Sequence, residues 1–343
     1  MLTDAPGRFH AFYSRSYLLL VRHLPWVWKF SYRLLDHALI HRCVQPLRRG
    51  WNLWIARRFV NRLSTQRPDL VVATHFLPAD VCSAGRGAGW LSAPLVVVIT
   101  DLYPHRFWIS READAVVVST AEGVAVLERR GIARDRIHVA GIPIGKAFSG
   151  PVDRALLRER FELQQGRRTV LITSGGTTIG QFERVVDAVA SLEEILPGQI
   201  QLLVVCGEDA GAQSRLTREA ARRAMPMRVF GFVDYMADLM AVSDLIVAKA
   251  GGLTVSEALG TGVPLILYHV IPGQERMNAE YVTRHGAAMI AARPSDVARA
   301  VRRCAEEPVR LEAMAGAARG LGHPDAADAI VSRVIQPLLQ APQ

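Results

Sequence analysis

The residues best suited to chemistry lie in one stretch, 244–278, which reads DLIVAKAGGLTVSEALGTGVPLILYHVIPGQERMN. Gly251 and Gly252 follow a short apolar run and precede a helical pattern, so they let the backbone turn without a Cβ in the way. Such a turn presents unpaired backbone N–H groups at the positive end of a helix dipole. The glycine pair therefore predicts a phosphate-binding turn.

The elements around this turn can be read from the same stretch. Residues 244–249 and 265–268 have the length and apolar content of buried strands. Thr254 and Glu257 have the T-x-x-E spacing of a capping box, which predicts a helix that begins near Thr254, and Gly262 is a stop signal. A purely structural interpretation stays open, in which the glycines only turn the chain and Glu257 only caps its helix.

A second polar group follows the next strand. Gln274, Glu275 and Asn278 lie in the loop after residues 265–268. In an open α/β sheet, loops at the carboxyl ends of strands face the ligand crevice. We therefore expect these side chains at a ligand site.

The runs GGLTVSEALGTGVP and PGQERMNAEYV resemble the nucleotide-sugar half of family 28 glycosyltransferases. Within that family they resemble the branch that glycosylates diacylglycerol, the monogalactosyldiacylglycerol synthases and bacterial processive diacylglycerol glucosyltransferases. The resemblance implies that Gly252, Leu253 and Thr254 meet the diphosphate of a UDP-sugar and that Glu257 meets the ribose hydroxyls. It assigns the donor sugar to Gln274, Glu275 and Asn278. A carboxylate accepts from vicinal hydroxyls and an amide both donates and accepts, so the residue types fit.

Two further loops extend the implied nucleotide site. A small-residue loop follows the strand predicted at 168–173, and the resemblance gives it a diphosphate contact through Ser174, Gly175, Gly176 and Thr177. The run GFVDYM resembles the uracil-binding turn of the family, with Phe232 and Val233 at the base. Packing of Phe232 into the core is the alternative.

The fold class follows from short apolar runs that alternate with helical patterns. The strands that this pattern predicts lie at 69–75, 94–100, 115–120, 137–140, 168–173, 202–207, 228–230, 244–249, 265–268 and 287–291. We expect an α/β protein of the GT-B type, with two Rossmann-like domains whose parallel sheets face a cleft. The acceptor domain is expected at 1–150 and the UDP-sugar domain at 151–343. The glycine-rich run 84–89 is expected to be a flexible connection.

Asp101 lies just past a predicted strand, in the run TDLYPHRFW, with His105 and Trp108 close behind. The diacylglycerol branch has a similar run, so Asp101 and His105 are the candidates for a catalytic or acceptor-binding role. A turn or helix cap is the alternative for Asp101.

The basic charge is concentrated at the N-terminus. Residues 1–67 carry twelve Arg or Lys against two Asp, a balance of +10, whereas the whole chain carries +9. Four of the six tryptophans lie there too. Arginines among aromatic residues suit a helical surface on an anionic bilayer, and we expect lipid contacts from residues such as Arg48, Arg49, Arg57 and Arg58. A basic hairpin that packs on its own domain is one alternative. Nucleic-acid binding is another, and we do not favour it because no such module is present.

The resemblance covers roughly residue 9 onward. Family members begin with a strand, a G-x-G-H loop and a second strand, so on the order of fifty family residues are absent here. Their histidine is the usual candidate base. A start codon assigned too far downstream is the explanation we favour, over a truncation that is inactive or needs a partner chain, or a variant that uses Asp101 or His105.

Composition sets the remaining expectations. Four cysteines far apart form no CxxC pair, and no DxD or HExxH motif occurs, so we expect no bound metal and no cofactor beyond the UDP-sugar co-substrate.

The expected function is inverting transfer of glucose or galactose from UDP-glucose or UDP-galactose to diacylglycerol. The expected location is cytoplasmic and peripheral, on the inner face of the membrane. The alternatives are a UDP-sugar-binding subunit without catalysis and a UDP-sugar epimerase.

Overall fold

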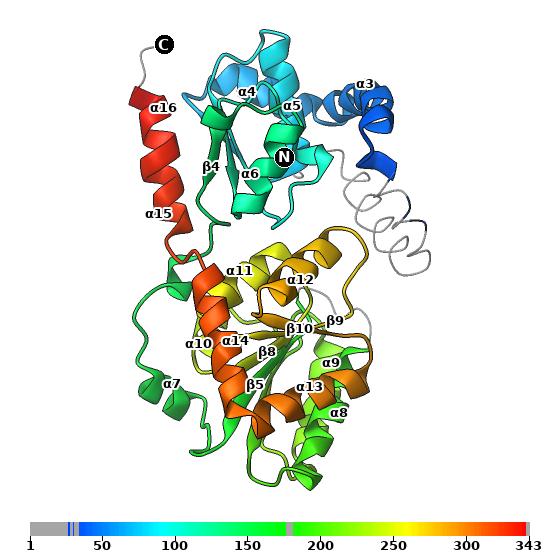
Figure 1. Cartoon of the computed structure of the whole chain (residues 1–343), viewed down its shortest axis with the longest axis vertical. Helices are drawn as coiled ribbons and strands as arrows, with labels where there is room; N and C mark the ends of the chain where they lie inside the picture. The colour runs from blue at the N-terminus through cyan, green and yellow to red at the C-terminus, as the bar shows by residue number, and fades with distance from the viewer. Residues whose placement is uncertain (1–26, 28–29, 31–33, 176–180, 341–343) are drawn as a thin grey trace. The chain divides into compact units, whose positions relative to one another are not determined.

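The computed structural model describes residues 27, 30, 34–175 and 181–340 (Figure 1), and the chain divides into two compact units. The first unit comprises Met1–Pro143, Ile271–Met277 and Ala326–Gln343. The second unit comprises Ile144–Val270 and Asn278–Asp325. The chain first passes between units after Pro143, a few residues before the boundary expected near residue 150.

The first unit is built on a parallel sheet with strand order β1-β2-β3-β4. Its strands are β1 (Val71–Ala73), β2 (Leu95–Val98), β3 (Ala115–Val118) and β4 (Ile137–Val139). Its helices are α3 (Ala38–Ile55), α4 (Arg57–Gln66), α5 (Phe76–Gly87), α6 (Ala121–Arg129), α15 (Ala326–Ile330) and α16 (Gln336–Gln340), with a 3-10 helix at Arg106–Trp108. All four predicted strands of this half are confirmed.

Helices cover both faces of this sheet, which is why β2 and β3 are buried along their whole length. One face packs against residues of α5 and α6, among them Cys82 and Leu127. The other face packs against Ala329, Ile330 and Val334 from the C-terminal helices. The apolar side of these last helices packs on that sheet face, so the residues after Asp325 return to the first unit. The sequence-based boundaries had placed them in the second domain.

The second unit is built on a parallel sheet with strand order β10-β9-β8-β5-β6-β7. Its strands are β5 (Arg168–Thr173), β6 (Ile200–Val205), β7 (Met227–Phe230), β8 (Leu245–Ala248), β9 (Leu265–Tyr268) and β10 (Ala288–Ala291). Its helices are α7 (Arg154–Arg160), α8 (Phe182–Ala190), α9 (Ala210–Ala220), α10 (Met236–Ala241), α11 (Gly252–Gly260), most of α12 (Gln274–Arg284), α13 (Pro294–Glu306) and α14 (Pro308–Leu321).

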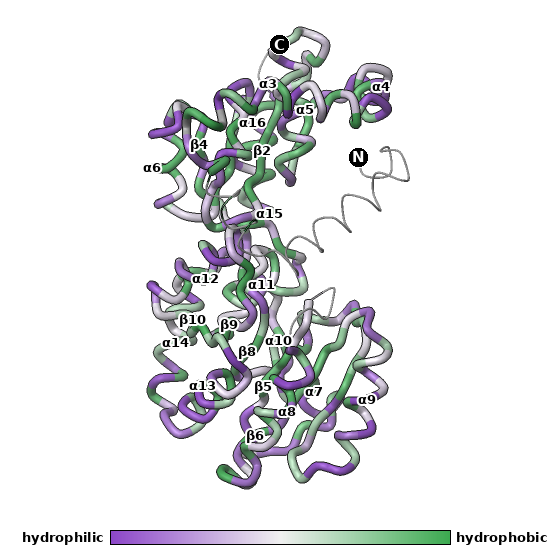
Figure 2. Tube along the Cα trace, turned by 90° about the vertical axis from the view of Figure 1, so that its right-hand side faces the viewer, coloured by the Kyte–Doolittle hydropathy of each residue, from purple (hydrophilic) through white to green (hydrophobic). Residues whose placement is uncertain are grey.

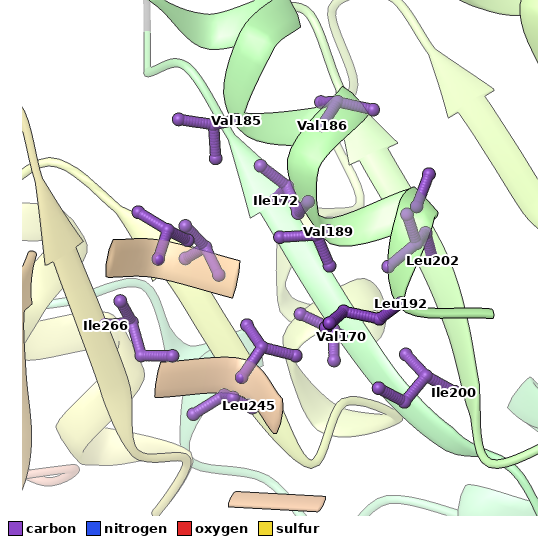
Figure 3. Close-up of a cluster of buried hydrophobic side chains, with 14 of the residues drawn as sticks. Val170, Ile172, Val185, Val186, Val189, Leu192, Ile200, Leu202, Leu245 and Ile266 are labelled. Carbon is purple, nitrogen blue, oxygen red and sulfur yellow. The ribbon is translucent and has the colours of Figure 1, made fainter. Parts of the chain in front are cut away.

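The main core of the second unit lies between this sheet and helices α8 and α13. Val170 and Ile172 of β5 point to that side, where they meet Val185 and Val189 of α8 (Figure 3). Figure 2 shows hydrophilic residues prevailing along outer helices such as α13. Because the neighbouring strands run parallel, their carboxyl ends lie at one edge of the sheet, as the sequence predicted.

The expectation of a flexible connection at 84–89 is wrong, because α5 continues through Gly87. Gly85 lies in this helix against the Trp90 ring, and a Cβ on it would come within 2.6 Å of that ring. Glycine is therefore present here for close packing. The chain turns only at Gly89, which has a positive φ of 78°.

Candidate functional site

The turn after β8 leads directly into α11, which begins at Gly252 with Gly251 as its N-cap. The predicted capping box is therefore wrong: Thr254 lies inside the first turn, and no side chain caps the helix. The first turn of a helix has N–H groups without intrahelical partners, and those of Gly252, Leu253 and Thr254 belong to it. Leu253 is exposed above them.

The space beside Gly251, at the N-terminus of α11, is open. Its φ of −65° and ψ of 139° are allowed for any residue, and a Cβ built on it meets no atom within 4 Å. Glycine is therefore not required here by folding. An anion that approaches the helix N-terminus would use this space.

Glu257 lies one turn further along α11 and is half-buried. Burial raises the pKa of the Glu257 carboxyl to about 7. The carboxyl therefore changes charge near neutral pH, where it can accept from a sugar hydroxyl in the ionised form.

The raised pKa of Glu257 predicts a specific pH dependence of stability. Between the ordinary pKa of about 4.3 and about 7, the unfolded chain ionises this group while the folded chain keeps it protonated, so stability falls as pH rises through that window. Glutamine cannot ionise. We therefore expect Glu257→Gln to raise the melting temperature more at pH 8 than at pH 5, as measured by circular dichroism. An equal change at both pH values would contradict the assignment.

The loop after β5 lies beside the turn after β8 in sheet order. Ser174 is buried, and its backbone N–H donates to Val205 O over 3.3 Å. Gly175 has a positive φ of 71° and open space around its α-carbon, which glycine tolerates without strain. Gly176 and Thr177, the other two predicted diphosphate contacts, lie outside the described residues.

Two side chains that the sequence missed follow β8 and β9. Lys249 comes directly after β8 and His269 directly after β9, and these strands are neighbours. Burial lowers the pKa of His269, and the Lys249 cation lowers it further. His269 also has a positive φ of 48°, unusual for a residue other than glycine. The position of Lys249 and His269 at the ends of predicted strands was the sequence signal that could have identified them as site residues.

Phe232 and Val233 lie in the turn after β7. The alternative in which Phe232 packs in the core is wrong, because 75% of its surface is exposed. Val233 is half-buried. An exposed aromatic ring at the carboxyl edge of the sheet is free to contact a planar base.

Asn278 is buried, with 1% of its surface exposed, and its Nδ2 donates to Ala250 O over 3.1 Å. This bond ties α12 to the turn before α11. Asn278 therefore holds the turn before α11 in place, a contact that its expected role at the donor sugar did not include.

Gln274 and Glu275 start α12 in the segment that belongs to the first unit. Glu275 Oε2 accepts from Ile271 N over 3.0 Å within its own loop. Gln274 Nε2 donates to Asp101 Oδ2 over 2.8 Å. The structure thus brings a predicted sugar ligand and the candidate catalytic carboxylate together.

Asp101 follows β2 at the carboxyl edge of the first sheet. Its Oδ2 also accepts from Trp108 Nε1 over 3.0 Å, and Trp108 is almost fully buried. His75, which the sequence analysis did not single out, follows the neighbouring strand β1, with its ring centroid 6.4 Å from that of Trp108. The same argument from strand ends that selected Asp101 would have found it.

His105 differs from Asp101 in its surroundings. Only 1% of its surface is exposed, and its Nδ1 accepts from Phe107 N over 3.2 Å as the cap of a 3-10 helix. Its Nε2 lies 3.7 Å from Asp36 Oδ1. These contacts hold the loop that carries Trp108.

The four arginines singled out in and after helix α3 divide into two that pair with acidic side chains and two that are exposed. Arg48 Nη2 donates to the buried Asp80 over 3.1 Å, and Arg49 lies 3.5 Å from both Asp80 and Glu112. Arg48 and Arg49 therefore balance the buried Asp80 of α5 and the half-buried Glu112 of the loop before β3, a role that their expected lipid contact did not include. Arg57 and Arg58 are exposed.

The opposite side of α3 exposes large apolar residues at helical spacing. Leu47, Trp51 and Trp54 have 78%, 58% and 58% of their surfaces exposed, and the two indole rings lie 5.4 Å apart. The alternative in which the aromatics of this segment pack on their own domain is wrong for these two tryptophans.

Within 34–175 and 181–340, no group of three or more His, Cys, Asp or Glu side chains is placed to hold a metal ion. Over the same part of the chain, no helix combines the length and apolar character needed to cross a membrane.

Two family models match this chain. Monogalactosyldiacylglycerol (MGDG) synthase matches residues 4–144, and the glycosyltransferase family 28 C-terminal domain matches residues 169–330. A processive diacylglycerol beta-glucosyltransferase of Bacillus cereus (strain AH187) is 30% identical over 274 residues, which cover 80% of this chain and 69% of the relative.

Solved structures agree on the fold. Acinetobacter baumannii MurG is 18% identical with a TM-score of 0.59, over 83% of this chain and 78% of MurG. UDP-GlcNAc 2-epimerase from Neisseria meningitidis is 15% identical with a TM-score of 0.62, over 82% of this chain and 81% of the epimerase. At such identities these likenesses show the GT-B fold alone. The sequence relatives decide the family: this chain is a glycosyltransferase of family 28, in the branch of the monogalactosyldiacylglycerol synthases and processive diacylglycerol glucosyltransferases.

Proposed function

We propose that the chain transfers a hexose, glucose or galactose, from a UDP-sugar to the sn-3 hydroxyl of diacylglycerol with inversion at the anomeric carbon. The observation that carries the proposal is the uncapped N-terminus of α11 with open space at Gly251. It supports a diphosphate site, and the diacylglycerol glucosyltransferase relatives support the acceptor.

In this proposal the donor lies along the carboxyl edge of the second sheet. The N–H groups of Gly252, Leu253 and Thr254 receive the diphosphate, and Glu257 accepts from the ribose hydroxyls. Phe232 lies against the uracil. As the bond between the anomeric carbon and the diphosphate breaks, negative charge grows on the leaving UDP, and the helix N-terminus with Lys249 stabilises it.

Asp101 is the general base in this proposal. It takes the proton of the acceptor hydroxyl while that oxygen forms its bond to the anomeric carbon, opposite the departing UDP. Its position after β2, with the carboxylate held by Trp108, supports this role better than the enclosed setting of His105 does.

The apolar side of α3 is the proposed membrane contact. Leu47, Trp51 and Trp54 would enter the headgroup layer, and Arg57 and Arg58 would meet lipid phosphates beside them. Such binding places the chain on a membrane that contains anionic lipid, where the acceptor is found. The cytoplasmic face is the side on which UDP-sugars are expected.

Two double substitutions separate the apolar and ionic parts of this contact. Arg57→Ser with Arg58→Ser should weaken binding to anionic vesicles by about 2 kcal/mol, roughly 30-fold, at low salt and much less at high salt. Trp51→Ser with Trp54→Ser should weaken it similarly at both salt concentrations. Cosedimentation with vesicles measures both. Unchanged binding in the tryptophan variant would remove α3 from the contact.

The transfer reaction is tested with labelled UDP-glucose, UDP-galactose and UDP-N-acetylglucosamine and with anionic vesicles that contain diacylglycerol. We expect labelled glycolipid from one of the two hexose donors, with the anomeric configuration inverted. UDP binding without transfer would favour the UDP-sugar-binding subunit, and an epimerised donor without lipid product would favour the epimerase. Either result would overturn the proposal.

A further inference from the structure

Asp101 Oδ2 accepts two N–H groups of different kinds. Trp108 Nε1 donates over 3.0 Å from a ring with 2% of its surface exposed, so this donor is fixed by packing. Gln274 Nε2 donates over 2.8 Å from the first residue of α12, which is half-buried. Gln274 follows Gly273, whose φ of 107° is allowed for glycine and strained for other residues. Because the Gln274 amide is less enclosed than the Trp108 indole, Gln274 is the donor that can exchange hydrogen-bond partners.

We infer that Gln274 is a positioning residue that holds Asp101 weakly basic until a donor-sugar hydroxyl takes over the Gln274 amide. The inference rests on the proposed function, in which Asp101 is the base, and on the contact of Gln274 with the donor sugar that the sequence resemblance implies. In this inference, occupancy of the donor site by a sugar sets the basicity of the Asp101 carboxylate.

The physical reason is the effect of hydrogen bonds on a carboxylate. Each N–H donated to the ionised form stabilises that form and lowers its affinity for a proton. When Gln274 Nε2 leaves, Asp101 keeps the Trp108 bond and becomes a stronger base. It then accepts the proton of the acceptor hydroxyl as the new glycosidic bond forms, and UDP leaves with the electron pair of the broken bond. Without a bound sugar the carboxylate keeps the Gln274 hydrogen bond and is the weaker base.

Other titratable groups lie near this cluster and must be separated from Asp101. His75 lies beside the Trp108 ring, and burial lowers its pKa. Glu275 accepts from Ile271 N beside Gln274. On the other side of the loop, His105 faces Asp36, which Arg130 Nη2 holds over 2.9 Å. Of these, His75 is the group whose charge would be sensed by the Trp108 indole, so a His75→Gln background removes its contribution.

The Trp108 indole N–H reports directly on the carboxylate that it contacts. Its resonance in ¹H–¹⁵N correlation spectra of the whole chain should shift with pH as Asp101 is protonated, and Trp108→Phe or backbone connectivities assign it. We expect Gln274→Ala to move the midpoint of this titration upward by about one pH unit. Saturation of the wild-type chain with UDP-glucose or UDP-galactose, whichever is the donor, should move it in the same direction, whereas UDP alone should not. In Gln274→Ala the sugar should add no further shift.

Gln66→Ala, at an exposed position of α4 in the same unit, is the matched control and should leave the midpoint unchanged. Equal midpoints in wild type and Gln274→Ala, or equal shifts with UDP and the UDP-hexose, would overturn the inference. The readout is independent of turnover. If the chain binds the donor and the midpoint shifts without any transfer, the proposed function fails and the coupling stands; if transfer proceeds with fixed midpoints, the reverse holds.

Discussion

Asp101→Asn should lower the rate of sugar transfer by about 10²- to 10⁴-fold and leave the dissociation constant for UDP nearly unchanged. The amide oxygen of asparagine can still accept from Trp108, so the loop keeps its contact, but the side chain can no longer take a proton. Initial rates with diacylglycerol vesicles and isothermal titration with UDP measure the two effects separately.

Asp69→Asn is the matched control for this substitution. Asp69 is exposed just before β1, in the same unit as Asp101, and it should tolerate the change with full activity. A transfer rate in Asp101→Asn within threefold of wild type would remove Asp101 as the base, by the convention that general-base loss costs at least about 10²-fold. His75 would then be the group to substitute next.

Gly251→Val should lower the affinity for UDP at least tenfold, about 1.4 kcal/mol, without unfolding the chain. The backbone of Gly251 is in a region that valine adopts readily, and a Cβ there meets no protein atom within 4 Å. The added methyl groups would instead occupy the space through which a diphosphate reaches the N–H groups of α11. Isothermal titration and thermal melting give the two readouts.

Gly320→Ala serves as the control for Gly251→Val, because Gly320 also has open space around its α-carbon and lies in helix α14, which supplies no residue of the turn. It should bind UDP as wild type does. Unchanged UDP affinity in Gly251→Val, with the melting temperature preserved, would move the diphosphate away from this turn.

The strands were the most predictable part of the fold. Continuous apolar runs such as those of β5 and β9 are too short for a typical buried helix. They are typical of a parallel strand that is buried on both faces. Helix starts were harder to place. The T-x-x-E pattern at Thr254 competes with the freedom of Gly251 to serve as N-cap, and the structure begins α11 at the glycine. Packing of Gly85 on Trp90 likewise turned an apparent loop into helix.

The candidate site was predictable where its residues lie close in sequence and follow strands. The contact of Gln274 with Asp101 joins residues 173 positions apart, and no local pattern carries that information. The pairing of Arg48 and Arg49 with the buried Asp80 on α5 and the half-buried Glu112 near β3 is of the same kind. Composition could locate the excess of basic charge, but only tertiary packing divides it between the interior and the exposed surface.

The most direct test of the account compares three chains in one assay: wild type, Asp101→Asn and Gly251→Val, each incubated with a UDP-hexose and diacylglycerol in anionic vesicles, with the lipids analysed by mass spectrometry. We expect wild type to add a hexosyl residue to diacylglycerol, Asp101→Asn to bind UDP but make almost no product, and Gly251→Val to be impaired in both. Product formation by all three at equal rates, or hexosyl transfer to water alone, would contradict it.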